Sequence, residues 1–320
     1  MHLKPIVILP GQPNSIFFEI FFKSLQKKIK SPIILVCCLK LFMGQAKKYK
    51  FNNTYNLISS KNVNIINLKN RSINIIDIRY KKGNTNLAQN RNSRAYLEKC
   101  FKVAFVLLKK KVTYKLLNGP INKKNFLTKR YLGITEYISD YFNTKKFGML
   151  IYNKKLSVCP LTTHLPVKLI SKNISKQLIR EKLILINNFY LDRFKFTPKI
   201  GVTGLNPHCE SILEFNEDKK IIAPVIKSMK KEGISCYGPY SADTIFLKQN
   251  RKKFDVILGM YHDQVLAPLK TLFEYDAINI TMGLSFLRVS PDHGPNERMI
   301  NKNLSNPTSL SRALEFLDQN

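Results

Sequence analysis

The stretch VILGMYHDQ, residues 256–264, decides the fold of this 320-residue chain. It begins with an apolar run, 256–260, that is typical of a strand buried on both faces, and it ends in polar side chains. Similar apolar runs recur along the sequence and predict further strands at 5–9, 31–37, 63–67, 103–107, 199–203 and 278–281.

Amphipathic segments alternate with these runs and predict helices at 15–28, 174–189, 218–232 and 309–317. Strands that alternate with helices indicate an α/β fold with a largely parallel sheet, and such folds bind ligands at the carboxyl ends of the strands. A chain of 320 residues suits two domains with a cleft between them. We therefore expect the polar residues that follow the strands to carry the chemistry.

The formal net charge of +32 raises the question of nucleic-acid binding. Lys and Arg are spread from Lys4 to Arg312, and the most basic runs, 109–111 and 251–253, are short and lack interleaved aromatic residues. A nucleic-acid footprint would be clustered on one element, so we expect no nucleic-acid partner. The charge is compatible with attraction of a small anionic substrate.

The six cysteines show no CxxC spacing, which favours reduced thiols in the cytoplasm. The apolar run near the N-terminus is too short for a secretory signal, and no stretch approaches the roughly 18 apolar residues of a membrane span. We therefore expect a cytoplasmic protein with no membrane partner.

Three of the five histidines lie in polar, turn-like segments: His164 in LTTHLP, His208 in GLNPHCE and His262 in MYHDQ. A metal site assembled from three strand ends would have this pattern. Three imidazoles suit zinc and other borderline divalent ions, and they leave a coordination position open for substrate or water. The residues alone leave open the alternative that each is an ordinary loop histidine.

Polar residues around these segments are further candidates. Asp243 and Asp263 could ligate the ion, orient an imidazole or cap a helix. Arg288 offers a planar fork for a carboxylate or phosphate, and Lys270 offers a compact charge for an oxyanion. In so basic a chain, a surface role for either cation is the alternative.

Five segments occur in an order and spacing that resemble the 4-hydroxythreonine-4-phosphate dehydrogenases, the PdxA family. They are LTTHLP, GLNPH, GP(x)₂ADT, MYHDQ(x)₅K and NIT(x)GL(x)F(x)R(x)S(x)DHG, spread over 161–294. NGPINK at 118–123 and G(x)TE at 133–136 are similar to two further family segments, and the likeness extends from about residue 5 to 310.

The resemblance implies the two-domain α/β/α fold of the isocitrate and isopropylmalate dehydrogenases. It also implies a homodimer, in which the active site lies in the interdomain cleft and is completed by the neighbouring subunit. We expect a cofactor-side domain at 1–128 plus 278–320, and a domain for metal, substrate and dimerisation at 129–277.

The implied reaction belongs to pyridoxal 5'-phosphate (vitamin B6) biosynthesis. NAD or NADP oxidises the secondary alcohol of 4-phosphooxy-L-threonine to 2-amino-3-oxo-4-phosphooxybutanoate, which then loses carbon dioxide to give 3-amino-2-oxopropyl phosphate. One divalent ion per site, zinc, magnesium or cobalt, would bind the hydroxyl oxygen and polarise the new carbonyl.

The family's functional residues can be carried over to matching positions. His164, His208 and His262 fall on its metal ligands, expected to converge at a subunit interface, and Asp243 falls on a catalytic carboxylate near the metal. Lys270 is the candidate for proton handling or oxyanion support. The expected substrate contacts are Thr135, Lys270, Asn279 and Arg288, and the expected cofactor contacts are Gly11, Asp292 and Gly294.

The chain departs from the family at three places. Ile134 stands where the family has a substrate-contacting histidine. The opening turn PGQPNSIFFE has Gln12 for an aspartate and lacks two glycines, at Ser15 and Phe17, which reduces its backbone freedom. In the loop after DHG, associated in the family with the cofactor's adenosine end, two glycine positions hold Asn301 and Asn303, and Asn tolerates the left-handed conformation next best.

Three interpretations remain open. The chain catalyses the family reaction with altered contacts, it oxidises a related phosphorylated hydroxy acid such as threonate or erythronate phosphate, or it is a metal-binding homologue without activity. The joint presence of Asp243, Lys270, Asn279 and Arg288 argues against the last, because metal binding alone does not require them.

Overall fold

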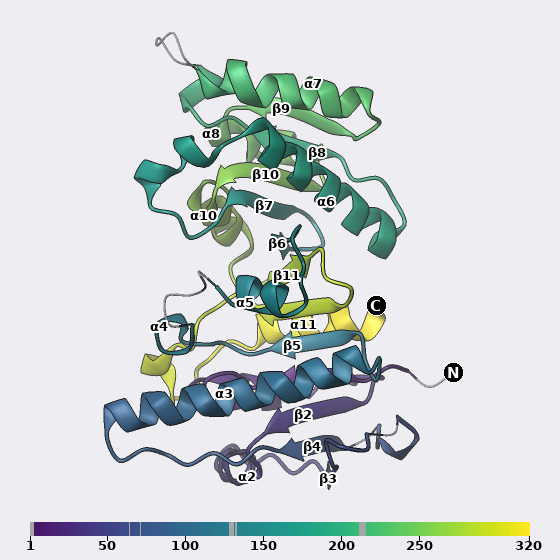
Figure 1. Ribbon diagram of the computed structural model, residues 1–320, viewed down its shortest axis with the longest axis vertical. Helices are drawn as coiled ribbons and strands as arrows, with labels where there is room; N and C mark the ends of the chain where they lie inside the picture. The colour runs from purple at the N-terminus through teal and green to yellow at the C-terminus, as the bar shows by residue number, and fades with distance from the viewer. Residues whose placement is uncertain (1–2, 64, 71, 128–130, 132, 211–215) are drawn as a thin grey trace. The chain divides into compact units, whose positions relative to one another are not determined.

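The structure of the chain, a computed structural model, describes residues 3–63, 65–70, 72–127, 131, 133–210 and 216–320. The chain forms two compact units (Figure 1). Unit 1 comprises Met1–Ile134 and Ser285–Asn320, and unit 2 comprises Thr135–Leu284. The sequence had placed the domain divisions slightly earlier, at 128/129 and 277/278.

Unit 1 is built on a parallel sheet. Its strand order is β3 (Tyr55–Leu57), β4 (Ile73–Asp77), β2 (Ile33–Cys37), β1 (Ile6–Leu9), β5 (Lys115–Asn118) and β12 (Leu287–Pro291). Helix α3 (Asn86–Lys109) packs on one face. The other face is covered by α1 (Phe17–Ser24), α2 (Leu39–Lys48) and α11 (Thr308–Gln319) (Figure 1).

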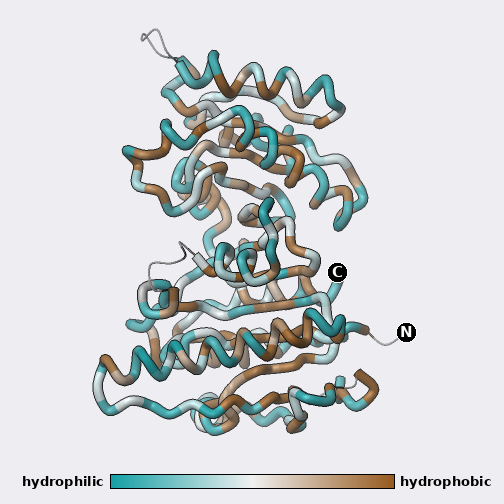
Figure 2. The backbone as a smooth tube through the Cα atoms, in the orientation of Figure 1, coloured by the Kyte–Doolittle hydropathy of each residue, from teal (hydrophilic) through white to brown (hydrophobic). Residues whose placement is uncertain are grey.

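Helix α3 corrects one sequence prediction, because it contains the apolar run 103–107 that was expected to be a strand. The helix starts at a capping Thr85, whose Oγ1 accepts from the backbone N–H of Ala88, and hydrophobic and hydrophilic residues alternate along it (Figure 2). A short apolar run inside a buried helix face cannot be distinguished from a strand by periodicity.

The strand predicted at 63–67 is also wrong, since Ile65–Asn67 form a 3₁₀ turn; Asn64 lies outside the described residues.

Unit 2 is built on a mixed sheet, in which β6 runs antiparallel to both neighbours and the other pairs are parallel. Its order is β11 (Ile278–Met282), β6 (Gly148–Tyr152), β7 (Ser157–Thr162), β10 (Val256–Tyr261), β8 (Ile200–Thr203) and β9 (Cys236–Tyr240). Helices α6 (Lys176–Phe194) and α7 (Ala223–Lys231) pack together, while α8 (Ala242–Ile245) and α10 (His262–Phe273) share a separate apolar core with β6, β7 and β10. The shorter helices of unit 2 are α5 (Ile134–Tyr141) and α9 (Lys248–Arg251), while the short α4 (Lys123–Phe126) belongs to unit 1.

The remaining element predictions are confirmed. Strands β1, β2, β8, β10 and β11 lie at the predicted apolar runs, and α1, α6, α7 and α11 lie within or across the predicted helical segments. The first part of 218–232 is a π-helical turn, Asp218–Ile222, that leads directly into α7.

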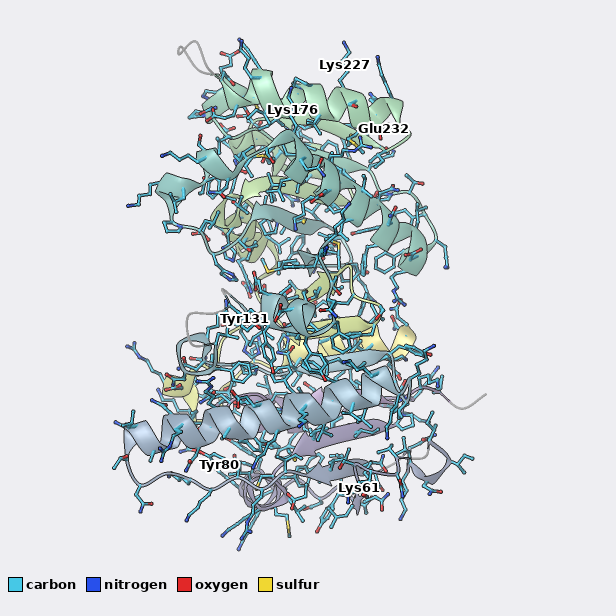
Figure 3. The ribbon with its side chains drawn as sticks, viewed as in Figure 1. Lys61, Tyr80, Tyr131, Lys176, Lys227 and Glu232 are labelled. Carbon is cyan, nitrogen blue, oxygen red and sulfur yellow. The ribbon has the colours of Figure 1, made fainter. Side chains whose placement is uncertain are left out.

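Surface and thiol properties agree with the composition. Exposed basic side chains occur on both units, for example Lys61 on unit 1 and Lys176 and Lys227 on unit 2 (Figure 3). All six cysteines are free thiols, as expected for a chain without a disulfide framework. In the described part of the chain, no helix combines the length and apolar character needed to cross a bilayer.

Candidate functional site

Three neighbouring parallel strands of unit 2 lead to the three predicted metal ligands. Strand β10 lies between β7 and β8 and is parallel to both, with Tyr261 paired with Thr162. Parallel strands end at the same edge of a sheet. His164 follows β7, His262 follows β10 as the first residue of α10, and His208 lies in the 3₁₀ turn Pro207–Cys209 after β8. The structure therefore gathers all three histidines at one edge, although they are far apart in sequence.

Two of the imidazoles are close to each other. The ring centroids of His164 and His262 are 5.9 Å apart. Two imidazoles bonded to one zinc ion at ~2.0–2.1 Å and a tetrahedral angle have centroids about 5 Å apart, so small side-chain rotations would bring this pair to a common ion. Among the described residues, no three His, Cys, Asp or Glu side chains already form a closed metal-binding group. The donor chemistry of the histidines thus fits a divalent ion.

The backbone at this edge is unusual. His164 and His208 adopt left-handed φ values of 55° and 54°, and Cys209 follows at 61°. Residues other than glycine adopt this conformation at a cost and keep it mainly where the surroundings enforce it, often at functional sites. Buried Asp218 helps to hold the backbone before His208 in place. Its carboxylate accepts hydrogen bonds from the backbone N–H of Leu205 at 2.7 Å and of Asn206 at 3.1 Å. Sequence reasoning placed Asp218 only in a helix and missed this role.

Two aspartates contact the histidine-bearing segments. Oδ1 of Asp263 lies 2.6 Å from Nδ1 of His262, an arrangement that favours the proton on Nδ1 and leaves Nε2 for a metal. Asp243 lies in the first turn of α8, where the Ser241 hydroxyl donates to it at 2.6 Å. This hydrogen bond is the main cause that lowers the pKa of Asp243, and the nearby His208 lowers it further. Asp243 is therefore an anion beside the edge, and Ser241, not Asp243, occupies the N-cap of α8.

Two predicted substrate contacts lie on neighbouring elements of unit 2. Thr135 in α5 places its Oγ1 3.5 Å from Oγ1 of Thr281 in β11, and Asn279 lies two residues earlier on the same face of that strand. Oδ1 of Asn279 is buried and has no hydrogen-bond partner among the described residues. Buried polar atoms are normally paired, so this oxygen is available to a bound ligand.

Lys270 shares helix α10 with His262. It lies near the end of α10, eight residues after His262, which corresponds to about 12 Å along the helix axis. The side chain is half-buried.

Unit 1 has a second edge of the same kind, at the carboxyl ends of adjacent parallel strands β1, β5 and β12. Gly11 follows β1 with φ 81°, and a Cβ added to it would lie 2.3 Å from the carbonyl oxygen of Pro120, just beyond β5. Asp292 follows β12 and its N–H donates to Ser309, while Gly294 faces open space. The three predicted cofactor contacts therefore lie on turns of one edge, where backbone can approach a ligand closely.

Arg288 also belongs to unit 1, on β12, and is only 3% exposed. Its Nε donates to Oδ1 of Asn118 at the end of β5, at 2.7 Å. Asn118, in the NGPINK segment, therefore positions this guanidinium. From the sequence, the NGPINK segment and the segment with Arg288 are two separate motifs.

The departures from the family have visible structural effects. Asn301 and Asn303 do adopt left-handed φ, 74° and 56°, so they reproduce the backbone expected of glycines. Phe17 packs against Gly119, where an added Cβ would lie 2.5 Å from the ring. Ile134 is 7% exposed. Residues 211–215, in the stretch after His208, lie outside the described residues.

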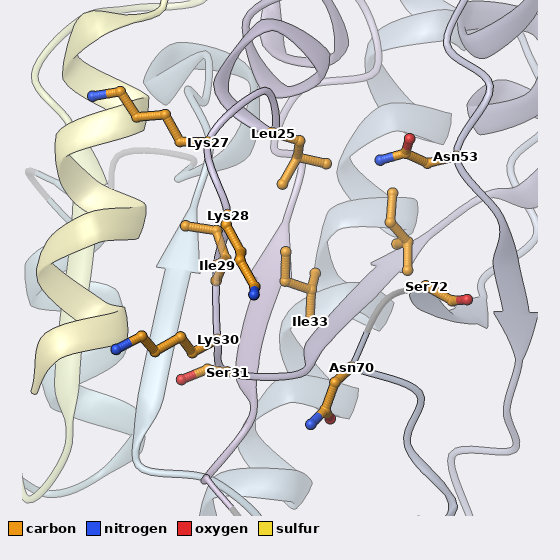
Figure 4. A pocket seen from close by; sticks show the side chains of 11 residues that line it. Leu25, Lys27, Lys28, Ile29, Lys30, Ser31, Ile33, Asn53, Asn70 and Ser72 are labelled. Atoms are coloured by element: carbon orange, nitrogen blue, oxygen red, sulfur yellow. The ribbon is translucent and has the colours of Figure 1, made fainter.

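A cavity of about 610 Å³ lies elsewhere in unit 1, near the start of β2 and β4 (Figure 4). It is lined by Leu25, Lys27, Lys28, Ile29, Lys30, Ser31, Ile33, Asn53, Asn70, Ser72 and Ile73. None of the predicted site residues is among them, and the amino ends of parallel strands are not where such sheets bind substrates.

The fold and its two polar strand edges define a two-domain α/β enzyme with a candidate histidine metal centre. Residues 28–317 match the family model of the pyridoxal phosphate biosynthetic protein PdxA. The chain belongs to this family.

Relatives and a solved structure agree with that assignment. A 4-hydroxythreonine-4-phosphate dehydrogenase from Sulfurihydrogenibium sp. is 35% identical over 97% of this chain and 96% of its own length. A D-threonate 4-phosphate dehydrogenase from Pectobacterium atrosepticum is 36% identical over 61% of each chain. The crystal structure of 4-hydroxythreonine-4-phosphate dehydrogenase from Klebsiella pneumoniae matches with a TM-score of 0.80, 26% identity and 98% coverage of both chains. The predicted two-domain α/β fold is confirmed, and a β-decarboxylating dehydrogenase from Thermococcus kodakarensis shares the fold at a TM-score of 0.51 and 14% identity.

Proposed function

We propose that this chain is an NAD(P)-dependent and divalent-metal-dependent 4-hydroxythreonine-4-phosphate dehydrogenase. It oxidises 4-phosphooxy-L-threonine to 2-amino-3-oxo-4-phosphooxybutanoate, which decarboxylates to 3-amino-2-oxopropyl phosphate, in pyridoxal 5'-phosphate biosynthesis. Family membership supports the reaction class. The observation that carries the assignment to specific residues is the gathering of His164, His208 and His262 at one edge of the unit 2 sheet.

In this proposal the three histidines hold one divalent ion, zinc, magnesium or cobalt. A bound ion supplies Lewis-acid polarisation of the substrate oxygen. Asp263 holds the His262 ring so that Nε2 is presented, and ionised Asp243 adds negative charge beside His208. The charge of Asp243 favours retention of a cation at this edge, and its carboxylate is a candidate proton acceptor.

The substrate's polar ends require separate partners. Arg288 is held by Asn118 in a fixed orientation, which suits bidentate binding of a phosphate or carboxylate. Thr135 and Asn279 present a hydroxyl and a buried amide oxygen for the amino and hydroxyl groups. Lys270 is proposed to supply a proton or stabilise the oxyanion.

The nicotinamide cofactor, NAD or NADP, accepts the hydride. We assign its binding to the turns at Gly11, Asp292 and Gly294, because they lie at one strand edge and expose backbone to a ligand. The left-handed Asn301 and Asn303 preserve the course of the following loop.

The active enzyme is proposed to be a cytoplasmic homodimer, with the active site completed by the second copy. The separation of Lys270 from His262 by about 12 Å along α10 supports this arrangement.

A related substrate is the second candidate. The likeness to a D-threonate 4-phosphate dehydrogenase and the apolar, buried Ile134 at a substrate-contacting position both favour it. Replacing an imidazole with an alkyl group removes a hydrogen bond to the substrate's polar end, and such a loss changes discrimination between close analogues.

The deciding experiment measures NAD(P)H formation with added Zn²⁺, Mg²⁺ or Co²⁺ on 4-phosphooxy-L-threonine, D-threonate 4-phosphate and erythronate 4-phosphate. Preference for the first supports the main proposal, and preference for either acid supports the second. Metal content is measured in parallel for the wild type and for His164→Ala, His208→Ala and His262→Ala, with His293→Ala in unit 1 as the control. Turnover of none of the three substrates by metal-loaded protein would support the inactive homologue.

A further inference from the structure

The side chain of Gln264 connects two of the three strand ends that lead to the histidines. Its Oε1 accepts from the backbone N–H of Met260 in β10 and from the hydroxyl of Thr203 in β8, each at 2.7 Å. Its Nε2 donates to the carbonyl oxygen of Gly204, again at 2.7 Å. The carboxamide therefore uses both of its ends to join β10 to β8.

Thr162 connects the third strand end. Its hydroxyl donates to the carbonyl oxygen of Met260 at 2.8 Å, so it joins the end of β7 to the same residue of β10. Met260 thus takes a side-chain hydrogen bond on each of its backbone polar groups, one from either side. We call Thr162, Met260, Gln264 and Gly204 the strand-end clamp.

The clamp lies immediately before each histidine. Thr162 is two residues before His164, Met260 is two before His262, and Gly204 is four before His208. The backbone at His164 and His208 is in the left-handed region and needs its surroundings to keep it there. A shift of one strand along its neighbour would therefore move the backbone positions of the three histidines relative to one another.

We propose that Gln264, assisted by Thr162, is a positioning residue for the metal-binding histidines. It does not touch the ion; it fixes the relative placement of the three strand ends, so that the imidazoles reach a divalent cation without reorganisation. The inference rests on the proposed metal site. Residues that orient metal ligands typically contribute ~10–100-fold to metal affinity.

Three variants test the hydrogen bonds of the strand-end clamp separately. Gln264→Met keeps the length of the side chain and removes all three hydrogen bonds. Gln264→Glu keeps the acceptor for Met260 but cannot donate to Gly204, so it selectively weakens the connection to β8. Thr162→Val keeps the shape and removes the connection between β7 and β10.

The control is Asn74→Leu in unit 1. Asn74 is a buried carboxamide with a comparable set of bonds, since its Nδ2 donates to the carbonyl oxygens of Ile33 at 3.0 Å and Lys69 at 3.1 Å, and its Oδ1 accepts from the N–H of Lys69 at 3.0 Å. This variant removes a buried amide network of similar size and leaves the strand-end clamp intact.

The experiment titrates full-length, metal-stripped protein with Co²⁺ and records the visible absorption spectrum, together with the melting temperature of the metal-free protein. We expect Co²⁺ affinity to fall ~10–100-fold in Gln264→Met, and to fall less in Gln264→Glu and Thr162→Val. The spectrum at saturation should change in shape, which a purely stabilising role would not cause. Asn74→Leu should melt earlier but bind Co²⁺ as the wild type does.

The alternatives are distinguishable. If His262→Ala loses Co²⁺ while the clamp variants bind it with wild-type affinity and spectrum, the inference is wrong and the proposed metal site stands. If the wild type binds no Co²⁺, or the histidine variants bind it with unchanged affinity, both the inference and the proposed metal site are wrong. Should Gln264→Met fail to fold, Gln264→Glu and Thr162→Val decide the question.

Discussion

Arg288 and Asn118 are joined across the β12–β5 strand pair by a buried hydrogen bond of 2.7 Å, from the guanidinium Nε to the amide Oδ1. This bond fixes the plane of the guanidinium, whose fork of donors suits an anion. The orientation of the proposed substrate-binding cation therefore depends on a residue from a different motif.

We predict that Arg288→Lys preserves the charge but raises the Michaelis constant for the phosphorylated substrate about tenfold or more, since one lost bidentate contact costs on the order of 1.4 kcal/mol. It should also destabilise the chain by ~1–3 kcal/mol, because Oδ1 of Asn118 loses its buried donor. Steady-state kinetics and urea unfolding measure the two effects. The control, Arg94→Lys, alters an exposed pair with Glu98 in α3 and should change neither.

A pair of glycine substitutions tests the turn after β1. Gly11→Ala places a Cβ 2.3 Å from the oxygen of Pro120 at a φ of 81°, and should destabilise the chain by on the order of 2 kcal/mol or more. Gly44→Ala, in exposed helix α2 with nothing within 4 Å of the new Cβ, should stabilise it by ~0.5–1 kcal/mol. Denaturant midpoints give both values. Equal effects in the two variants would contradict the strained geometry assigned to Gly11.

The buried Lys115 gives a pH dependence of stability. Burial lowers the pKa of its ammonium, although Asp318 partly opposes this. The folded chain therefore loses this proton at a lower pH than the unfolded chain does. Between the two pKa values, unfolding takes up a proton. The free energy of unfolding therefore rises with pH through that interval, up to about pH 10.4.

Lys115→Met should remove this rise and increase the melting temperature at pH 7, because the long apolar stem remains and the buried charge is gone. Thermal unfolding between pH 7 and 10.5 measures it. Lys253→Met, at an exposed position, serves as the control. A wild-type curve that falls over the same interval, with no change in Lys115→Met, would refute the assignment.

Metal removal tests the proposed reaction directly. Dialysis against a chelator should abolish NAD(P)H formation, and readdition of one divalent ion per site should restore it. Far-ultraviolet circular dichroism should change little, since the strands and helices of each unit are held by buried apolar side chains and not by the ion. Retention of full activity after the metal content has fallen to zero would exclude the Lewis-acid role.

The sequence predicted β1, β2, β8, β10 and β11 from their apolar runs, but it missed the apolar run of β6, GMLIY, and several strands whose runs are short or interrupted. Strand β7 reads SVCPLT, with a proline and polar residues among its buried positions, and β5 is only four residues long and begins with Lys115. Conversely, the run 103–107 looked like a strand because its neighbours in α3 could not be recognised as one helical face from so short a window.

The candidate site likewise contains residues that the sequence alone could suggest and residues that it could not. The histidines could be named as candidates because histidine is rare in this chain and all three lie in polar, turn-like segments; their role as metal ligands stays a prediction. The roles of Gln264, Thr162 and Asp218 could not be predicted, because each depends on which backbone N–H and carbonyl groups the fold brings within hydrogen-bonding distance. Linear sequence contains no record of that proximity.

The placement of chemistry on strand ends has a consequence for how this sequence can evolve. The strands of both units bury mainly apolar side chains, and Ile and Val contribute to this burial in β1, β2, β8 and β10. The exposed surface tolerates a large excess of Lys. Substitutions that preserve apolar volume in the strands and solvation at the surface therefore leave the fold intact, whereas the histidines after β7, β8 and β10 are constrained by the proposed metal site.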